Sequence, residues 1–230
     1  MKKQVPAPAP VLLNLDVPRV ITLKSKSGEF VYKTRRVTLK DWEQCFLGFI
    51  DQSLRVDGEF QKVYDADSSL IELADRVIVD CNTAKVPFSH RLAVGAVLRT
   101  ATPVEDSGAE VMDRVVIGLG AVWPVEGASQ VFEGLLHCFR YPSIEDLKRW
   151  KFENSRVRVR GEGKDSVSSY PSRLAIAMKL YDDLIESVDG YAVGGAPLEG
   201  KENIVREMDG AHKAMAVMAL FTRDSEVDVQ

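Results

Sequence analysis

The feature that most constrains this chain is an internal repeat, which predicts two copies of one structural unit. Residues 37–42 (VTLKDW) resemble residues 142–147 (PSIEDL), which lie 105 positions later. Three further pairs of similar segments follow in the same order: residues 55–59 with 158–162, 73–78 with 180–185, and 89–98 with 211–220. The spacing grows only where loops can accept insertions, so we predict a tandem duplication.

Each copy is expected to contain two strands followed by three helices. Alternating apolar residues around turn signals predict the strands, and apolar residues at helical spacing predict the helices. The strands are expected at 19–23, 30–33, 114–119 and 134–140, and the helices at 39–53, 68–79, 86–99, 143–154, 171–188 and 202–222. The predicted fold class is therefore α+β, a duplicated unit of a β-hairpin and about three helices, with the two units packed together.

The first helix of each copy has a recognisable start. Thr38 and Ser143 precede an acidic residue by three positions, Asp41 in the first copy and Asp146 in the second. This spacing resembles a capping box, with aspartate in place of the usual glutamate or glutamine. Both sites therefore predict an N-terminal helix cap.

The repeat also divides the chain into five regions. Residues 5–10 (VPAPAP) favour an extended conformation because proline fixes the backbone angle φ. We expect this segment to become ordered only on a neighbouring molecule, so that removing residues 1–17 leaves the monomer folded. The five regions are an N-terminal arm (1–18), a first unit (19–99), a linker (100–113), a second unit (114–222) and an acidic tail (223–230).

Composition and charge narrow the classes of function. Of the 230 residues, 45% are hydrophobic and 28% are charged, which is typical of a globular protein. The net charge of −4 gives no support to a general nucleic-acid binder. Cys45, Cys81 and Cys138 stand far apart, which fits neither a disulfide framework nor a Cys-x-x-Cys metal site. With no long apolar run, we expect a protein of the cytoplasm.

A basic run at residues 156–164 (RVRVRGEGK) is the most distinctive local motif. As a strand it would place Arg156, Arg158 and Arg160 on one face, and with Lys164 they form a candidate contact for phosphate or an acidic partner. The favoured alternative is a solvated strand edge on which charge prevents unwanted pairing. The run lacks the glycine and hydroxyl residues of a phosphate-binding loop, so no nucleotide site is predicted.

Two histidines, His90 and His212, occupy matching positions in the last helix of each copy. They are candidates for a general base or ligand, but a repeated structural contact is the favoured interpretation. Asp75 and Asp182 also match, and the four side chains define a hypothetical enzyme site between the copies. The sequence predicts no catalytic, cofactor-binding or metal-binding set.

Part of the second copy resembles a known group of proteins. Residues 139–146 (FRYPSIED), Trp150 and residues 158–164 (RVRGEGK) are similar to uncharacterised proteins encoded among phage and prophage structural genes. The similarity covers most of the second copy and, in degraded form, the first. It implies a tail-associated, virion or assembly protein, and it identifies no catalytic residue.

The leading expectation is a non-enzymatic phage-type structural or assembly protein that acts through protein–protein interfaces. Its partners would be other copies of itself or other phage structural proteins, in the host cytoplasm or in a virion. No cofactor, small-molecule substrate or membrane is expected. One alternative is a small enzyme with its site between the copies. The other is a nucleic-acid-binding accessory protein that uses the four basic residues of the 156–164 run.

Overall fold

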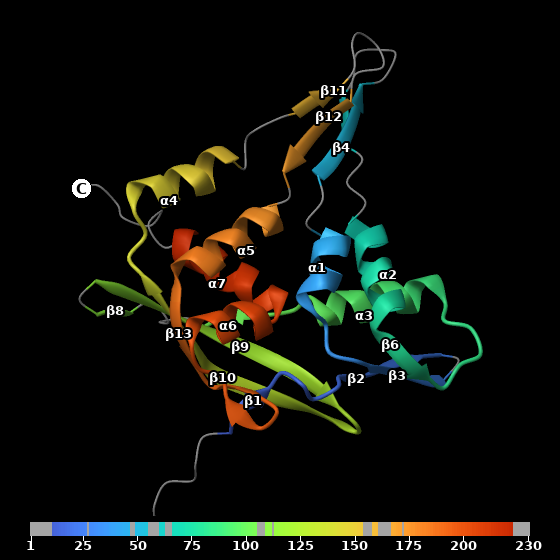
Figure 1. The fold of residues 1–230 in the computed structure, drawn as a ribbon. Coiled ribbons are helices and arrows are strands. Elements are labelled where there is room, and N and C mark those ends of the chain that lie inside the picture. The colour runs from blue at the N-terminus through green and yellow to red at the C-terminus, as the bar shows by residue number, and fades with distance from the viewer. Residues whose placement is uncertain are drawn as a thin grey trace, which may run out of the picture.

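The chain folds into helices and mainly antiparallel sheets, which confirms the predicted α+β class. The structure, a computed structural model, shows the helices between a layer of long strands and a small sheet on the opposite side (Figure 1). It describes residues 11–26, 28–46, 49–54, 60–62, 66–104, 109–111, 113–153, 158–160, 167–171 and 173–222.

The first half places three helices on a small antiparallel sheet. Strands β2, β3 and β6 form this sheet in that order, and α1, α2 and α3 pack on it around buried Tyr32, Trp42 and Leu73. The elements are β2 (Val20–Ser25), β3 (Gly28–Thr34), α1 (Leu39–Phe46), β4 (Phe49–Leu54), β5 (Phe60–Lys62), α2 (Ala66–Val77), β6 (Ile78–Cys81) and α3 (Phe88–Leu98).

The second half builds a larger version of the same arrangement. A long hairpin of β9 and β10 is flanked by β13 on one side and by β7 and β8 on the other, and α5 and α7 cover it. The elements are β7 (Thr102–Pro103), β8 (Ala109–Val111), β9 (Arg114–Val125), β10 (Ala128–Arg140), α4 (Ile144–Lys148), η1 (Arg149–Glu153), β11 (Arg158–Arg160), β12 (Val167–Pro171), α5 (Arg173–Leu184), β13 (Ile185–Asp189), β14 (Tyr191–Val193), β15 (Ala196–Pro197), α6 (Lys201–Glu207) and α7 (Gly210–Thr222).

The two halves share their order of elements apart from insertions. The series β2, β3, α1, β4, β5, α2, β6, α3 matches β9, β10, α4, β11, β12, α5, β13, α7. Helices α2 and α5 correspond from end to end at a separation of 107 residues. Strand β6 pairs with β3, and β13 pairs with β10 in the same way, and both pairs contain a register shift. That the two halves arose by duplication stays a prediction.

Both predicted helix caps are present in the structure. Ser143 and Asp146 form a reciprocal capping box, and the Asp146 carboxylate also accepts a hydrogen bond from Arg140 at 2.8 Å. In the first half Thr38 donates to the Asp41 carboxylate from its backbone and its hydroxyl, at 2.9 and 2.7 Å. Arg35 binds Asp41 as Arg140 binds Asp146, so an arginine–aspartate pair reinforces each cap.

Several of the predicted helices end or break earlier than expected, because strands or breaks interrupt them. The region 39–53 ends its helix at Phe46 and continues as β4, and α2 and α5 run directly into β6 and β13. Helical spacing of apolar residues is a local signal, whereas strand pairing with distant segments overrides it. The region 202–222 divides at Asp209, whose carboxylate accepts the backbone N–H of Ala211 at 2.8 Å and starts a new helix.

The N-terminal arm is shorter than the predicted 1–18. Strand β1 (Leu13–Asn14) pairs in parallel with β14, and the side chains of Leu13 and Leu15 are only 1% and 2% exposed. Residues 11–18 therefore belong to the fold, and residues 1–10 lie outside the described residues. The predicted linker 100–113 also contains β7 and β8, which pair with β9, while the tail 223–230 lies outside the described residues.

The two halves meet in a shared core. Met178 and Ala211 of the second half pack in the core of the first, and Leu174 and Met215 contact both cores. The backbone of α7 lies directly against a tryptophan of α1, since a Cβ atom on Gly210 would be 2.6 Å from the ring of Trp42. Any larger residue at this position would force the two helices apart.

A buried arginine joins the halves electrostatically. The Arg19 guanidinium donates to the Leu98 carbonyl at 2.8 Å and to the Asp209 carboxylate at 3.3 Å. It also lies 3.8 Å from the centroid of the Trp123 ring. Arg19 and Asp209 are 5% and 6% exposed, so each charge depends on the other for compensation.

We expect Asp209→Asn to cost about 3 kcal/mol of unfolding free energy, because it leaves the Arg19 charge buried without its counter-ion. Denaturant unfolding measures this loss. Asp80→Asn is the matched control, since Asp80 pairs with Lys33 at an exposed site 3.9 Å away and should change stability by less than about 0.5 kcal/mol. Replacing Arg19 by Met in the Asp209→Asn background should recover part of the loss. Equal effects of Asp209→Asn and Asp80→Asn would contradict this assignment.

Two truncations at the N-terminus should show which residues of this segment contribute to the stability of the fold. Removal of residues 1–10 should leave the unfolding free energy of the monomer unchanged, since we expect the segment 5–10 to become ordered only on a neighbouring molecule. Removal of residues 1–17 deletes Leu13 and Leu15, and truncating one buried leucine to alanine typically costs about 2–5 kcal/mol. The longer deletion should therefore unfold at much lower denaturant concentration. Equal stability of the two truncated chains would show that β1 contributes nothing.

Candidate functional site

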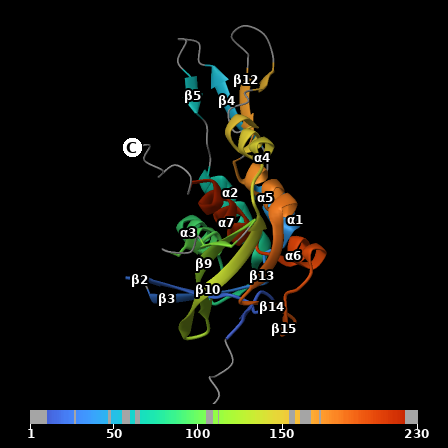
Figure 2. The ribbon, with the colours of Figure 1, turned by 90° about the vertical axis from the view of Figure 1, so that its left-hand side faces the viewer.

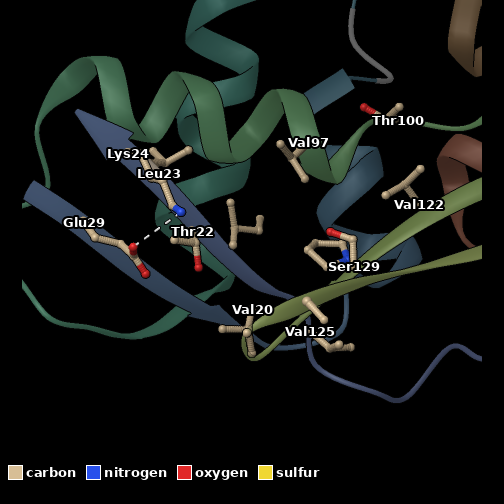
Figure 3. A pocket seen from close by; sticks show the side chains of 14 residues that line it. Val20, Thr22, Leu23, Lys24, Glu29, Val97, Thr100, Val122, Val125 and Ser129 are labelled. Carbon is tan, nitrogen blue, oxygen red and sulfur yellow. Dashed lines mark ion pairs between the residues drawn. The ribbon is translucent and has the colours of Figure 1, made fainter. Parts of the chain in front are cut away.

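A groove between the two halves has a volume of about 540 Å³. Strand β2 forms one wall, the tip of the β9–β10 hairpin forms the other, and the end of α3 covers the space between them (Figure 3). The residues that line it are Val20, Ile21, Thr22, Leu23, Lys24, Glu29, Val97, Thr100, Val122, Pro124, Val125, Gly127, Ala128 and Ser129.

Strand edges border this groove on both sides. β2 is the terminal strand of its sheet, and its residues 20–24 line the groove consecutively, so the backbone edge takes part as well as one face. On the other side, residues 121–125 of β9 pair with β10 and with no other described strand. Pro124 lies on this stretch and has no N–H to donate, as is common on edge strands.

The hairpin tip owes its shape to a tight turn. β9 continues to Val125 and β10 begins at Ala128, so two residues connect them, and Gly127 has a φ of +73°. A side chain is strained at such an angle, whereas glycine adopts it readily. The strands predicted at 114–119 and 134–140 therefore both extend as far as this turn, and the extended hairpin supplies the second wall of the groove.

The groove surface is mainly apolar and carries one ion pair. Lys24 and Glu29 lie 3.8 Å apart at its rim, and both side chains are largely exposed. Val122 is 57% exposed although it is a valine, and its cross-strand partner Val131 is 66% exposed outside the groove. Apolar walls beside open backbone edges are suited to an extended segment that adds as a further strand.

The two matching histidines each bond to a tyrosine, and the described contacts do not bring them together. His90 is half-buried, and its Nδ1 atom lies 2.6 Å from the hydroxyl of Tyr32. His212 is fully buried, and its Nδ1 atom lies 2.8 Å from the hydroxyl of Tyr191. Neither histidine lines the groove.

His212 ends a hydrogen-bonded chain inside the second half. Tyr181 bonds to Nδ1 of His137 at 2.9 Å, and Nε2 of His137 bonds to Tyr191 at 2.8 Å. One assignment of protons satisfies nearly the whole chain: Tyr181 donates to His137, His137 to Tyr191, and Tyr191 to His212. The Nε2 atom of His212 then has no hydrogen-bond partner among the described residues.

Burial keeps every member of this chain neutral. Desolvation lowers the pKa of His212 to about 4, partly opposed by the Asp209 charge, and lowers the pKa of His137 well below its usual value. Desolvation also raises the pKa values of Tyr181 and Tyr191 well above 10. Neutral side chains in a closed core stabilise the second half and have no route to a substrate in the groove.

The two matching aspartates also have separate partners. Asp75 accepts a hydrogen bond from Arg91 at 2.9 Å on the surface of the first half. Asp182 accepts one from the buried ammonium of Lys213 at 2.7 Å, and burial, its largest influence, raises its pKa. No described hydrogen bond or ion pair joins any two of Asp75, Asp182, His90 and His212.

The described part of the basic run lies on β11, in the sheet that β11, β12, β4 and β5 form. Arg158 and Arg160 are the end residues of β11, whereas Arg156 and Lys164 lie outside the described residues. The sequence comparison matched residues 158–162, which begin with β11, to residues 55–59. Residues 55–59 lie outside the described residues. In the structure β11 corresponds to β4, which precedes that segment.

The remaining reactive groups are dispersed. The three cysteines are free thiols, and burial raises the pKa of Cys45 to about 11. Among the residues that the structure describes, no three histidine, cysteine or acidic side chains gather as metal ligands. Within the same residues, no helix combines the length and apolar character needed to cross a membrane.

The sequence interpretation did not identify the groove. The exposed valines of the hairpin tip, Val122 and Val131, were a possible signal, because they lie on the solvent side of otherwise alternating strands. Strand β2 approaches the hairpin only in three dimensions, and no local pattern predicts that. Comparison of the chain with protein-family models, curated proteins and solved structures found no match.

The buried histidines should make stability depend on pH. The folded state keeps His212 neutral down to about pH 4, whereas an unfolded histidine gains its proton near pH 6.5. Below pH 6.5 the unfolded state therefore binds more protons, and stability falls as the pH decreases. For His212 this loss reaches about 3 kcal/mol by pH 4.

His212→Gln should reduce the slope of unfolding free energy against pH between pH 4 and 6.5, measured by urea unfolding at several pH values. Tyr191→Phe is the control, because it removes the hydroxyl between the histidines but leaves both of them buried. This control should lower stability at every pH and retain the slope. An unchanged slope in His212→Gln would mean that this histidine gains protons in the folded state.

Proposed function

We propose that this chain is a non-enzymatic structural or assembly protein of the phage type, which acts through contacts with other protein subunits. The groove between two strand edges is the observation that carries the proposal. Its walls are mainly apolar, its volume is about 540 Å³, and the strand edges on both sides pair with no further strand among the described residues. The resemblance of the second half to proteins encoded among phage structural genes supports the same conclusion.

The chemistry of the lining favours binding over catalysis. Among the described residues that line the groove, Lys24 and Glu29 are the only charged ones, and they form an ion pair with each other at its rim. The other polar side chains of this lining are the hydroxyl groups of Thr22, Thr100 and Ser129, and no histidine or cysteine accompanies them. A nucleophile of this kind needs an adjacent base, which the described lining does not provide.

We assign the N-terminal segment of a second copy as the occupant of the groove. Residues 5–10 alternate proline with small apolar residues (VPAPAP), and ten residues precede the first described residue. In an extended chain the prolines fall on one edge, which has no N–H donors, while Val5, Ala7 and Ala9 keep theirs on the other. Such a segment can add to one strand edge and present a blocked edge outward.

Self-association through this contact predicts an oligomer. Light scattering across a wide concentration range should give a mass that is a multiple of 25.5 kDa. Removal of residues 1–10 should weaken the association at least tenfold, which corresponds to about 1.4 kcal/mol. Val122→Asp should have the same effect, because it places a charge on the wall of the groove.

The hairpin itself provides the matched control. Val131 lies directly opposite Val122 and is similarly exposed, but it does not line the groove, so Val131→Asp should leave the mass unchanged. A full-length chain that stays monomeric at every concentration would contradict the proposal. So would equal effects of Val122→Asp and Val131→Asp, or an oligomer unaffected by removal of residues 1–10.

A further inference from the structure

The two halves of the chain jointly build a four-stranded sheet, whose order is β11, β12, β4, β5. The hairpin β4–β5 comes from the first half and the hairpin β11–β12 from the second. Strands β12 and β4 pair antiparallel at the centre, from Val167 opposite Ser53 to Pro171 opposite Phe49. The sheet stands above the helices, away from the rest of the molecule (Figures 1 and 2).

The pairing at the centre of this sheet has an unusual relation to its two outer strands, β11 and β5, each of which has one neighbouring strand among the described residues. In the order of elements β4 corresponds to β11, and β5 corresponds to β12. The central contact therefore joins the first strand of one hairpin to the second strand of the other. The two terminal strands, β11 and β5, are again a first strand and a second strand, so they are equivalent to the pair that is already joined.

The correspondence of the two hairpins also gives a register for pairing β5 with β11. The last pair before the hairpin loop is Leu54 opposite Phe60 in the first half and Arg160 opposite Val167 in the second. Transferring the central register from β12 and β4 to β5 and β11 places Phe60 opposite Val159. It also places Gln61 opposite Arg158.

The charges of β11 favour its pairing with β5 of a second copy over its pairing with another β11 strand. Strand β11 reads Arg-Val-Arg, so two antiparallel β11 strands centred on Val159 would put Arg158 opposite Arg160 twice. Like charges directly opposite one another destabilise a strand pair. In the transferred register the same arginine is opposite Gln61, and a glutamine is neutral and has an amide oxygen that can accept a hydrogen bond.

We propose that β5 of one copy pairs antiparallel with β11 of a second copy, which extends the four-stranded sheet from molecule to molecule. The central β12–β4 pair is the intramolecular form of this contact, and this continuity identifies a second copy as the partner. Because the two surfaces differ, the contact is heterologous and produces a closed ring or an open filament. This inference rests on the proposed assembly function and specifies the contact that propagates it.

A charge-reversal series tests the pairing. Gln61→Arg places two arginines opposite one another and should weaken self-association up to about fivefold for each contact, an effect equivalent to about 1 kcal/mol. Adding Arg158→Glu to the same chain should restore association, since the two introduced side chains would then be opposite one another with unlike charges. Gln130→Arg is the control, because it makes the same change at an exposed position outside the sheet and the groove. Sedimentation velocity over a concentration series measures each chain.

The outcomes separate this inference from the proposed function. Weakening by Gln61→Arg alone, with rescue by Arg158→Glu, supports pairing of β5 with β11. An oligomer that Val122→Asp dissociates and Gln61→Arg leaves intact overturns the edge contact but leaves the assembly function standing. Failure of Arg158→Glu to rescue also overturns it, and a chain that is monomeric throughout overturns both proposals.

Discussion

The buried charge of Arg19 is the constraint on which the junction of the two halves depends. Its guanidinium requires a carbonyl at the end of α3, the carboxylate of Asp209 before α7 and the ring of Trp123 on β9, all in place at once. A buried charge is stable only when such partners are complete. The next residue, Val20, begins the wall of the groove, so the position of the groove follows from the same set of contacts.

The hydrogen-bonded chain of histidines and tyrosines is buried, whereas the strand edges beside the groove lie at the surface. His137, His212, Tyr181 and Tyr191 bond to one another in a closed core, where desolvation holds them neutral. The accessible features are backbone edges, with apolar side chains beside the groove at β2 and β9. This division suits a protein whose partners are other polypeptides, because strand addition uses backbone hydrogen bonds and apolar contact.

Local signals in the sequence predicted the local features well. The caps at Thr38 and Ser143 depend on an acidic side chain three residues away, a distance that helix geometry determines, and both are present. The similarity of residues 73–78 to 180–185 predicted the correspondence of α2 with α5 at the correct separation. The site was less predictable. Asp75, Asp182, His90 and His212 match along the chain, yet the described contacts of each are with a different neighbour.

The sequence by itself determined the α+β class and the helix starts, since these depend on spacings within a few residues. The tertiary structure alone decided where helices give way to strands, which edges stay open and how the groove forms. Strand β4 pairs with β12 more than a hundred residues away, and β2 meets the hairpin tip only after both halves fold. Such pairings depend on backbone groups that every residue carries, and therefore no local pattern of side chains specifies them.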